Sequence, residues 1–209
     1  MRQSLILASA SPRRADLLRM IGVRFEVVPS DLDETTDPEW SPEKTVAELA
    51  SMKAVHVGAG HPDRIGIGAD TVVVTDDRIL GKPEDPDDAR ATLRMLSGRT
   101  HQVMTAVHLI WTEEELVASA VETTDVTFRD LSDDDIDRYL ATSEPYDKAG
   151  AYGIQGQAAL FTEGIRGCFY NVVGFPIVRF WALLNEITDG HADDYRDGTT
   201  SPDLLALGE

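Results

Sequence analysis

The sequence predicts a mixed α/β (α+β) fold, on three observations. Its first half alternates short apolar runs with capped amphipathic stretches, which is typical of strands followed by helices. Residues 102–111 and 116–128 then form two long β-like stretches joined by an acidic turn. No internal repeat or low-complexity linker divides the chain. A single α+β unit and two lobes around a cleft would both fit this order.

A pair of arginines lies at the junction of the first predicted strand and helix. Residues 5–8 are apolar, Ser11 and the proline after it suit the start of a helix, and Gly22 suits its end. Arg13 and Arg14 then fall in the first helical turn, where each costs about 0.3–1 kcal/mol against the helix dipole. Guanidinium groups beside free N–H donors indicate an anion-binding site. Two solvated surface arginines would explain an isolated pair equally well.

The next elements follow from the same signals. A short strand at residues 25–29 leads through an acidic loop to a second helix, which Ser41 caps and which runs to about Gly60. Residues 65–74 are too apolar for a strand with one exposed face, so they predict a central strand. An acidic turn then returns the chain as a hairpin into residues 79–83.

Three further helices are expected in the rest of the chain. Asp85 begins a helix that stops at Gly98. Ser132 begins another after the long hairpin, with acidic residues well placed at its N-terminus. Residues 170–174 predict a strand, and residues 176–187 predict the last helix.

Charge and composition narrow the functional classes. The chain has 209 residues, a formal net charge of −18 and 42% hydrophobic residues. This charge argues against polymeric nucleic acid or an anionic membrane as a partner, because the overall field repels polyanions. No apolar run is long enough to span a membrane, and no signal-peptide pattern is present. Together with a single cysteine, Cys168, these features predict a cytoplasmic protein without an internal disulfide.

Asp70 is the most conspicuous acidic residue, because it lies within the apolar central strand. An ionised carboxylate there is costly unless it is paired or bound to a metal. The predicted hairpin folds Lys82 back roughly opposite it. Two interpretations stay open: a structural Asp70–Lys82 ion pair, or a carboxylate that holds a divalent cation or activates water while Lys82 meets a phosphate.

A glycine-rich segment at residues 147–156 is the second candidate for ligand binding. Its three glycines allow a ligand to approach the backbone closely. Lys148, Tyr152 and Gln155 offer a cation, an aromatic face and an amide that can read a base edge. The segment is neither a Walker P-loop nor a dinucleotide-binding motif, and a surface turn is the alternative.

Six segments, in order along the chain, resemble the motifs of the Maf proteins, septum-formation-inhibitor-like nucleoside triphosphate pyrophosphatases. The resemblance covers residues 4 to 188 approximately. The segments are SASPRRADLL (9–18), GADTVV (68–73), GKP (81–83), LSGRTHQV (96–103), KAGAYGIQG (148–156) and VGFP (173–176).

The resemblance implies a fold related to the inosine-triphosphate pyrophosphatases, elongated and with two lobes around a central cleft. It implies one catalytic domain with two lobes over residues 1–188. Residues 189–209 lie outside the resemblance, and their polar, acidic composition predicts a loosely ordered tail. The implied reaction hydrolyses a nucleoside triphosphate between the α and β phosphates, with Mg²⁺ or Mn²⁺ as cofactor.

The resemblance also assigns roles to individual residues. Asp70 matches the catalytic proton acceptor. The implied catalytic residues are Asp70, Lys82, Glu34 and Lys53. The implied substrate-binding residues are Ser9, Arg13, Arg14, Thr71 and Gln155. Asp70 and Glu34 are the implied metal ligands, which suits the preference of hard divalent ions for oxygen.

The sequence Ala-Asp-Thr at residues 69–71 resembles the branch of the family that acts on dTTP and UTP. The branch that acts on 7-methyl-GTP carries Ser-Asp-Gln there. We expect a nucleoside triphosphate as the substrate partner and leave a homodimer open. Two alternatives remain: a pyrophosphatase for a purine or methylated nucleotide, and a nucleotide-binding regulator of cell division with little turnover.

Overall fold

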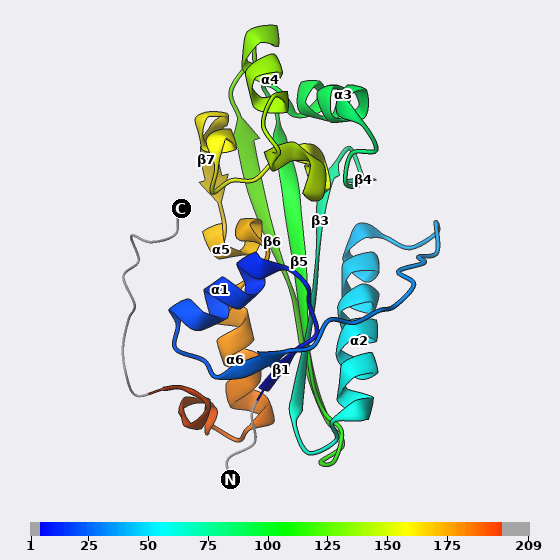
Figure 1. Ribbon diagram of the computed structural model, residues 1–209, viewed down its shortest axis with the longest axis vertical. Coiled ribbons are helices and arrows are strands. Elements are labelled where there is room, and N and C mark those ends of the chain that lie inside the picture. Colours follow the sequence, from blue (N-terminus) through cyan, green and yellow to red (C-terminus); the bar gives the residue numbers. More distant parts are fainter. Residues whose placement is uncertain (1–4, 198–209) are drawn as a thin grey trace.

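One long sheet runs through the whole length of the molecule in the computed structural model, which describes residues 5–197 (Figure 1). The strand order is β2-β1-β3-β5-β6-β7, and β4 pairs with β3 outside this path. β1 is parallel to its two neighbours, and all other pairs are antiparallel. The strands are β1 (Leu5–Leu7), β2 (Phe25–Val27), β3 (Ile65–Thr75), β4 (Arg78–Leu80), β5 (Thr100–Trp111), β6 (Leu116–Phe128) and β7 (Thr162–Arg166).

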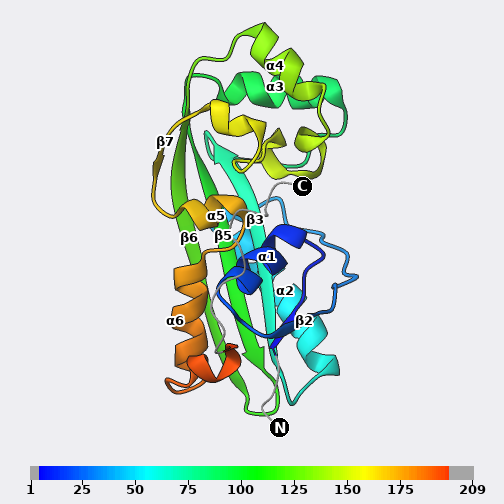
Figure 2. The same ribbon diagram turned by 60° about the vertical axis from the view of Figure 1, so that its left-hand side comes forward.

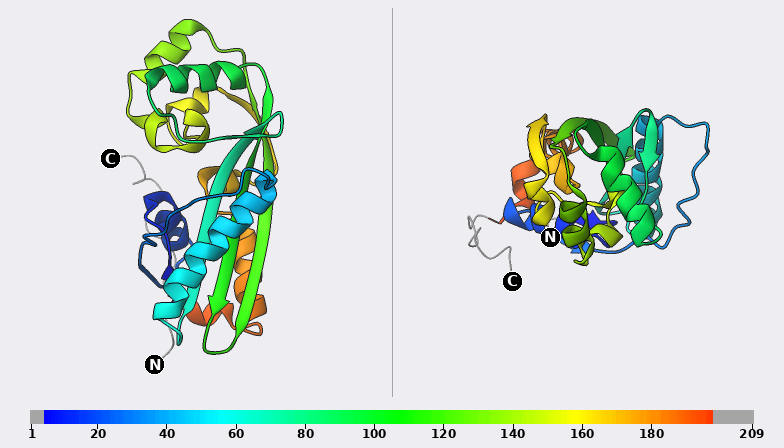
Figure 3. Two further views of the ribbon diagram at one scale, coloured as in Figure 1. Left: turned by 90° about the vertical axis from the view of Figure 1, so that its right-hand side faces the viewer. Right: turned by 90° about the horizontal axis from the view of Figure 1, so that it is seen from above.

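Helices gather into two lobes that share the three longest strands, β3, β5 and β6 (Figure 3). α1, α2 and α6 cover the sheet at one end, whereas α3 and α4 lie at the other, and α5 lies between (Figures 1 and 2). The α-helices are α1 (Pro12–Met20), α2 (Pro42–Gly60), α3 (Pro86–Leu96), α4 (Asp133–Leu140), α5 (Phe169–Val173) and α6 (Ile177–Ile187). The 3₁₀ helices are η1 (Glu144–Asp147), η2 (Ala149–Ala151), η3 (Gln157–Leu160) and η4 (Ala192–Tyr195).

This architecture confirms the mixed α/β fold with two lobes. The caps predicted from sequence also hold: Ser41 Oγ accepts a hydrogen bond from the Lys44 amide, and Asp85 accepts one from the Asp88 amide. Ser11 occupies the N-cap position of α1 without a side-chain cap bond, and Gly22 follows the helix with a φ of +75°.

Glycines on β3 allow α2 to lie unusually close to the sheet. A Cβ at Gly68 would come within 2.0 Å of the Ala50 carbonyl oxygen and 2.7 Å of the Ala54 amide nitrogen, both in α2. Asp70 lies two residues along the same strand and therefore on the same face. The close packing of α2 thus brings a side chain of that helix, Lys53, to Asp70.

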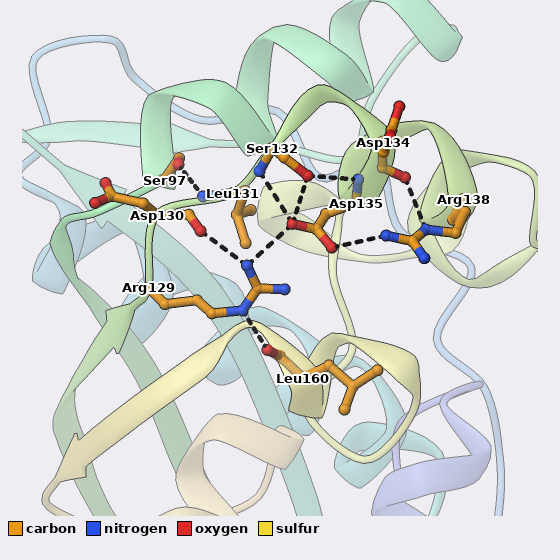
Figure 4. A network of polar contacts seen from close by, with 9 residues as sticks. All are labelled: Ser97, Arg129, Asp130, Leu131, Ser132, Asp134, Asp135, Arg138 and Leu160. Atoms are coloured by element: carbon orange, nitrogen blue, oxygen red, sulfur yellow. Dashed lines mark hydrogen bonds and ion pairs between the residues drawn. The ribbon is translucent and has the colours of Figure 1, made fainter.

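The lobe that contains α3 and α4 is tied to the end of β6 by a carboxylate at the start of α4 (Figure 4). Asp135 accepts hydrogen bonds from the Ser132 amide and hydroxyl, completing a capping box. It also accepts one from Arg129 Nη1 at 3.0 Å. These bonds, with that from Arg129 foremost, hold the pKa of Asp135 well below its usual range.

One element expected from the sequence needs correction. Residues 170–174 are not a strand, because Phe169–Val173 forms the short helix α5, which ends at Gly174 with a φ of +117°. An apolar run of this length does not distinguish a strand from a helical turn. The structure describes the expected tail as far as Asp197: η4 buries Ala192 and Tyr195, and Arg196 bridges to Val23. The remainder of the tail, including the apolar residues 204–207, lies outside the described residues.

No helix within residues 5–197 is both long enough and apolar enough to cross a membrane.

Candidate active site

A cleft of about 680 Å³ opens where one edge of β3 is left without a strand partner. β1 pairs with β3 as far as Ile67, and β4 pairs with it from Val73 onward. Between these two partners β3 has a free edge, and Asp70, Thr71, Val72 and Val73 of this strand line the cleft. A cleft of this size suits a small-molecule ligand.

All nine residues that the resemblance assigned to the site line this cleft. They are Ser9, Arg13, Arg14, Glu34, Lys53, Asp70, Thr71, Lys82 and Gln155. Their places in the sequence span both lobes, and only the fold brings them together. The structure shows their proximity, whereas their roles in catalysis stay predictions.

Two carboxylates converge on the ammonium group of Lys53. Lys53 Nζ lies 2.6 Å from Asp70 Oδ1 and 3.0 Å from Glu34 Oε1. The Lys53 and Asp70 side chains are only 9% and 13% exposed, whereas Glu34, on the loop before α2, is half exposed. The buried carboxylate in the central strand is therefore compensated by a cation from α2, as its burial requires.

The structural Asp70–Lys82 ion pair that the sequence left open is wrong, because Asp70 pairs with a different lysine. The β3–β4 hairpin does carry Lys82 into the cleft, and Lys82 is exposed there. Within residues 5–197, however, the ion pair of Asp70 is with Lys53. Sequence spacing missed this pair because Lys53 and Asp70 lie on different elements, and only the packing of α2 on β3 joins them.

Arg14 is a structural clamp rather than a free cation. Its Nε donates to the Gly174 carbonyl at 2.9 Å, and its Nη1 donates to the Ala69 carbonyl at 2.8 Å and to Ser9 Oγ at 3.2 Å. Its Nη2 donates to Thr71 Oγ1 at 3.1 Å. Burial lowers the pKa of the guanidinium, an effect that nearby Asp70 opposes. Arg14 therefore holds α1, β3 and the end of α5 together.

Arg13, in contrast, reaches across the cleft to the other lobe. Its Nη1 lies 3.4 Å from Asp147 Oδ2, in η1, and both side chains are partly exposed. Lys148 Nζ lies 2.5 Å from the other oxygen of the same carboxylate. The two arginines that looked alike in sequence thus differ, because Arg13 is the one that remains accessible to a ligand.

The glycine-rich segment forms the wall of the cleft opposite α1. Gly150 has a φ of +70°, its amide donates to the Gly81 carbonyl at 3.0 Å, and a Cβ there would lie 3.0 Å from the Val73 side chain. Tyr152 is buried, and its hydroxyl lies 2.8 Å from His101 Nε2. Gln155 is exposed at the edge of the cleft. The segment is therefore held on the sheet and presents its polar residues to the cleft.

The charges of the cleft differ in sign from those of the whole chain. Five cations and four carboxylates line it, which gives a local charge of +1 in a protein of net charge −18. Such a local reversal favours an anionic ligand. Asp147 and Lys148 belong to the glycine-rich segment that the sequence singles out, whereas Glu144 lies before it and carries no sequence signal for the cleft. The charged lining residues are Arg13, Arg14, Lys53, Lys82, Lys148, Glu34, Asp70, Glu144 and Asp147.

The two carboxylates at Lys53 could hold a divalent cation only if a bound ligand supplied further oxygen atoms. Within residues 5–197 no cluster of three or more His, Cys, Asp or Glu side chains is arranged to hold a metal. Asp70 and Glu34 do converge, since both lie within 3.0 Å of the same Lys53 nitrogen. Two carboxylates plus phosphate oxygens and water are a usual environment for Mg²⁺.

The fold and the cleft define an α/β protein with a site for a small anionic ligand. The family model for Maf-like proteins matches residues 4–187. The dTTP/UTP pyrophosphatase of Bacillus cytotoxicus is 48% identical over 185 residues, which cover 88% of this chain and 96% of the relative. That of Dictyoglomus thermophilum is 48% identical over 188 residues, covering 90% and 97%. The solved Staphylococcus aureus Ham1 protein is similar over 90% of this chain and 99% of its own, at 13% identity and a TM-score of 0.49.

This chain belongs to the Maf family.

Proposed function

We propose that this protein is a nucleoside triphosphate pyrophosphatase that hydrolyses dTTP and UTP to the monophosphate and pyrophosphate. The observation that carries the proposal is the convergence of Asp70 and Glu34 on Lys53 within a cleft of local positive charge. The dTTP/UTP pyrophosphatases of Bacillus cytotoxicus and Dictyoglomus thermophilum, each 48% identical over most of the chain, support the same substrates.

Binding of the triphosphate relies on the accessible cations of the cleft. The substrate brings about four negative charges to a protein of net charge −18, so nearby cations must outweigh the overall field. Arg13 and Lys82 are placed to meet phosphate oxygens from opposite sides of the cleft, and Ser9 adds a hydroxyl. Gln155 adds an amide for the base.

The chemical step requires a proton acceptor. Water attacks the α-phosphorus, the bond from that phosphorus to the α–β bridging oxygen breaks, and pyrophosphate leaves. Asp70 takes the proton that the attacking water loses, and Lys53, 2.6 Å away, holds the carboxylate in position for this task. Glu34, on an exposed loop, is the second carboxylate at Lys53.

Asp70 and Glu34 are also the residues that would hold Mg²⁺ or Mn²⁺, together with the substrate. Such a cation, when bound, would neutralise charge on the phosphate oxygens. We also propose that the protein lies in the cytoplasm and forms a homodimer.

Isotope labelling tests both the activity and the position of cleavage. The purified protein is given UTP with Mg²⁺ or Mn²⁺ in H₂¹⁸O, and the products are identified by mass spectrometry. Attack at the α-phosphorus predicts ¹⁸O in UMP and unlabelled pyrophosphate. The same assay with dTTP, CTP, ATP, GTP, ITP and 7-methyl-GTP ranks the substrates. Production of UDP and orthophosphate, or preference for a purine nucleotide, would overturn the proposal.

A further inference from the structure

Thr71 lines the cleft, and its hydroxyl group makes polar contacts with the protein behind the cleft wall. It follows Asp70 in β3 and therefore lies on the opposite face of the strand. Its Oγ1 accepts a hydrogen bond from Arg14 Nη2 at 3.1 Å and lies 2.9 Å from Thr105 Oγ1. The Gly174 carbonyl is more distant, at 3.5 Å.

Thr105 continues this contact into the interior. It is directly opposite Thr71 in the β3–β5 pairing and is fully buried. Its Oγ1 lies 3.1 Å from the Asn171 carbonyl in α5, to which it can donate. Arg14, Thr71, Thr105 and the Asn171 carbonyl therefore form one continuous series of polar contacts from the cleft to the core.

The two ends of this series fix the direction of its hydroxyl protons. A guanidinium can only donate and a carbonyl can only accept, whereas each threonine hydroxyl has a single proton. All three contacts are hydrogen bonds only if Arg14 donates to Thr71, Thr71 to Thr105, and Thr105 to the carbonyl. The reverse order between the threonines would leave the 3.1 Å contact to Asn171 without a proton.

We propose that Thr105 is a specificity-determining positioning residue, because it takes the proton of Thr71 and leaves Thr71 able to meet a nucleotide only as a hydrogen-bond acceptor. Phosphate oxygens are acceptors too, so Thr71 does not serve the triphosphate. It pairs instead with an N–H or O–H donor of the substrate. In dTTP and UTP the shared donors are the imide N3–H of the base and the 3′-hydroxyl of the sugar.

This inference rests on the proposed function, and it is tested with the Thr105→Val variant. Valine keeps the shape of the side chain but removes the acceptor, so the Thr71 hydroxyl becomes free to turn and donate. Thr105→Ser keeps the hydroxyl. Thr100→Val is the control, because Thr100 also lies in β5 and contacts another threonine hydroxyl, Thr127 Oγ1, at 2.8 Å. Thr127 does not line the cleft, whereas Thr71, the partner of Thr105, does.

The measurement is kcat/KM for UTP, CTP and 3′-deoxy-UTP with each variant. CTP carries an acceptor at N3 where UTP carries a donor, and 3′-deoxy-UTP lacks the sugar donor. We expect Thr105→Val to reduce one of the two preferences, UTP over CTP or UTP over 3′-deoxy-UTP, by roughly tenfold. Thr105→Ser and Thr100→Val keep both ratios of the unmodified protein. The ratio that falls identifies which donor Thr71 reads.

Unchanged ratios in Thr105→Val, or an equal loss for all three nucleotides, would overturn the inference. If Thr105→Val does not fold, Thr71→Val provides the test, since removal of the acceptor itself must reduce the same ratio. If the unmodified protein hydrolyses no nucleotide, the proposed function fails on its own. The inference is then judged by the same comparison of dissociation constants, measured by calorimetry with α,β-methylene-UTP and α,β-methylene-CTP.

Discussion

Lys53 Nζ lies 2.6 Å from Asp70 Oδ1, and the same ammonium group lies 3.0 Å from Glu34 Oε1. One buried cation from α2 thus holds a carboxylate from the central strand and another from an irregular loop. Without it, two negative charges would face each other, one of them on the largely buried side chain of Asp70. The pair is therefore expected to matter for the stability of the fold and for activity.

Replacement of Lys53 tests this dual role. Lys53→Met should lower the free energy of unfolding by about 2–4 kcal/mol, because it leaves the Asp70 carboxylate buried and unpaired. Lys44→Met, at an exposed position near the start of the same helix, is the control and should change stability little. Adding Asp70→Asn to Lys53→Met should restore part of the lost stability without restoring turnover. Denaturant unfolding and pyrophosphate release on the same preparations measure both. An additive double variant would show that the two side chains do not interact.

The two adjacent arginines should respond differently to replacement by alanine. Arg13→Ala should lower kcat/KM, because it removes about 2–4 kcal/mol of transition-state stabilisation if Arg13 meets the charge that develops on the phosphates. Its melting temperature should change little. Arg14→Ala should lower the free energy of unfolding by about 2–4 kcal/mol, because it removes hydrogen bonds to β3 and to the end of α5.

Arg19→Ala, an exposed position of the same helix, should affect neither property. Equal effects of the Arg13 and Arg14 variants on stability would show that the distinction between an accessible and a structural arginine is wrong.

The close approach of α2 to β3 predicts a strong effect of one methyl group. Gly68→Ala places a Cβ within 2.0 Å of the Ala50 carbonyl, so the helix must shift and carry Lys53 away from Asp70. We expect a loss of at least 3 kcal/mol, roughly the upper range for overpacking, and a fall in activity. Gly60→Ala is the matched control, since a Cβ there meets no described atom within 4 Å. Thermal unfolding of both variants decides, and equal melting temperatures would contradict the argument.

His101 should make stability depend on pH. It is buried against Tyr152 and Phe128, and burial lowers its pKa to about 4. The unfolded chain, with an ordinary histidine pKa near 6.5, therefore binds more protons between pH 6.5 and 4, and stability falls as the pH is lowered through this range. The expected loss from this residue is up to about 3 kcal/mol.

Urea unfolding of the unmodified protein and of His101→Gln between pH 4 and 7 isolates this contribution. The difference in stability between the two proteins should shrink as the pH falls. A difference that stays constant over the range would contradict the low pKa of His101.

Local signals in the sequence predicted most elements because caps and periodicity are encoded within a few residues. Ser41, Asp85 and Ser132 each mark the helix start that the structure shows. The strand predicted at residues 170–174 was wrong because so short an apolar run has no periodicity that would distinguish a strand from a helix. Helix α5 is set by long-range bonds, such as those from Asn171 Nδ2 to the Val103 carbonyl and Thr124 Oγ1.

The candidate site could be predicted only as a set of residues. The family resemblance named nine of the residues that line the cleft, but their pairing depends on packing between distant elements. Spacing suggested Lys82 as the partner of Asp70, whereas the packing of α2 supplies Lys53. The sequence likewise predicted substrate binding for both Arg13 and Arg14, and only the backbone carbonyl groups bonded by Arg14 distinguish the two.

The most direct test of the central claim compares the unmodified protein with Asp70→Asn in the release of pyrophosphate from UTP. Asparagine keeps the shape of the side chain but removes its charge and basicity, and Glu34 remains as a partner for Lys53. We predict that turnover falls at least 10²-fold, roughly the scale of lost general-base catalysis, while the protein stays folded with a similar melting temperature. Near-normal turnover per folded molecule, with a marked loss of stability, would show instead that Asp70 is only half of a structural ion pair.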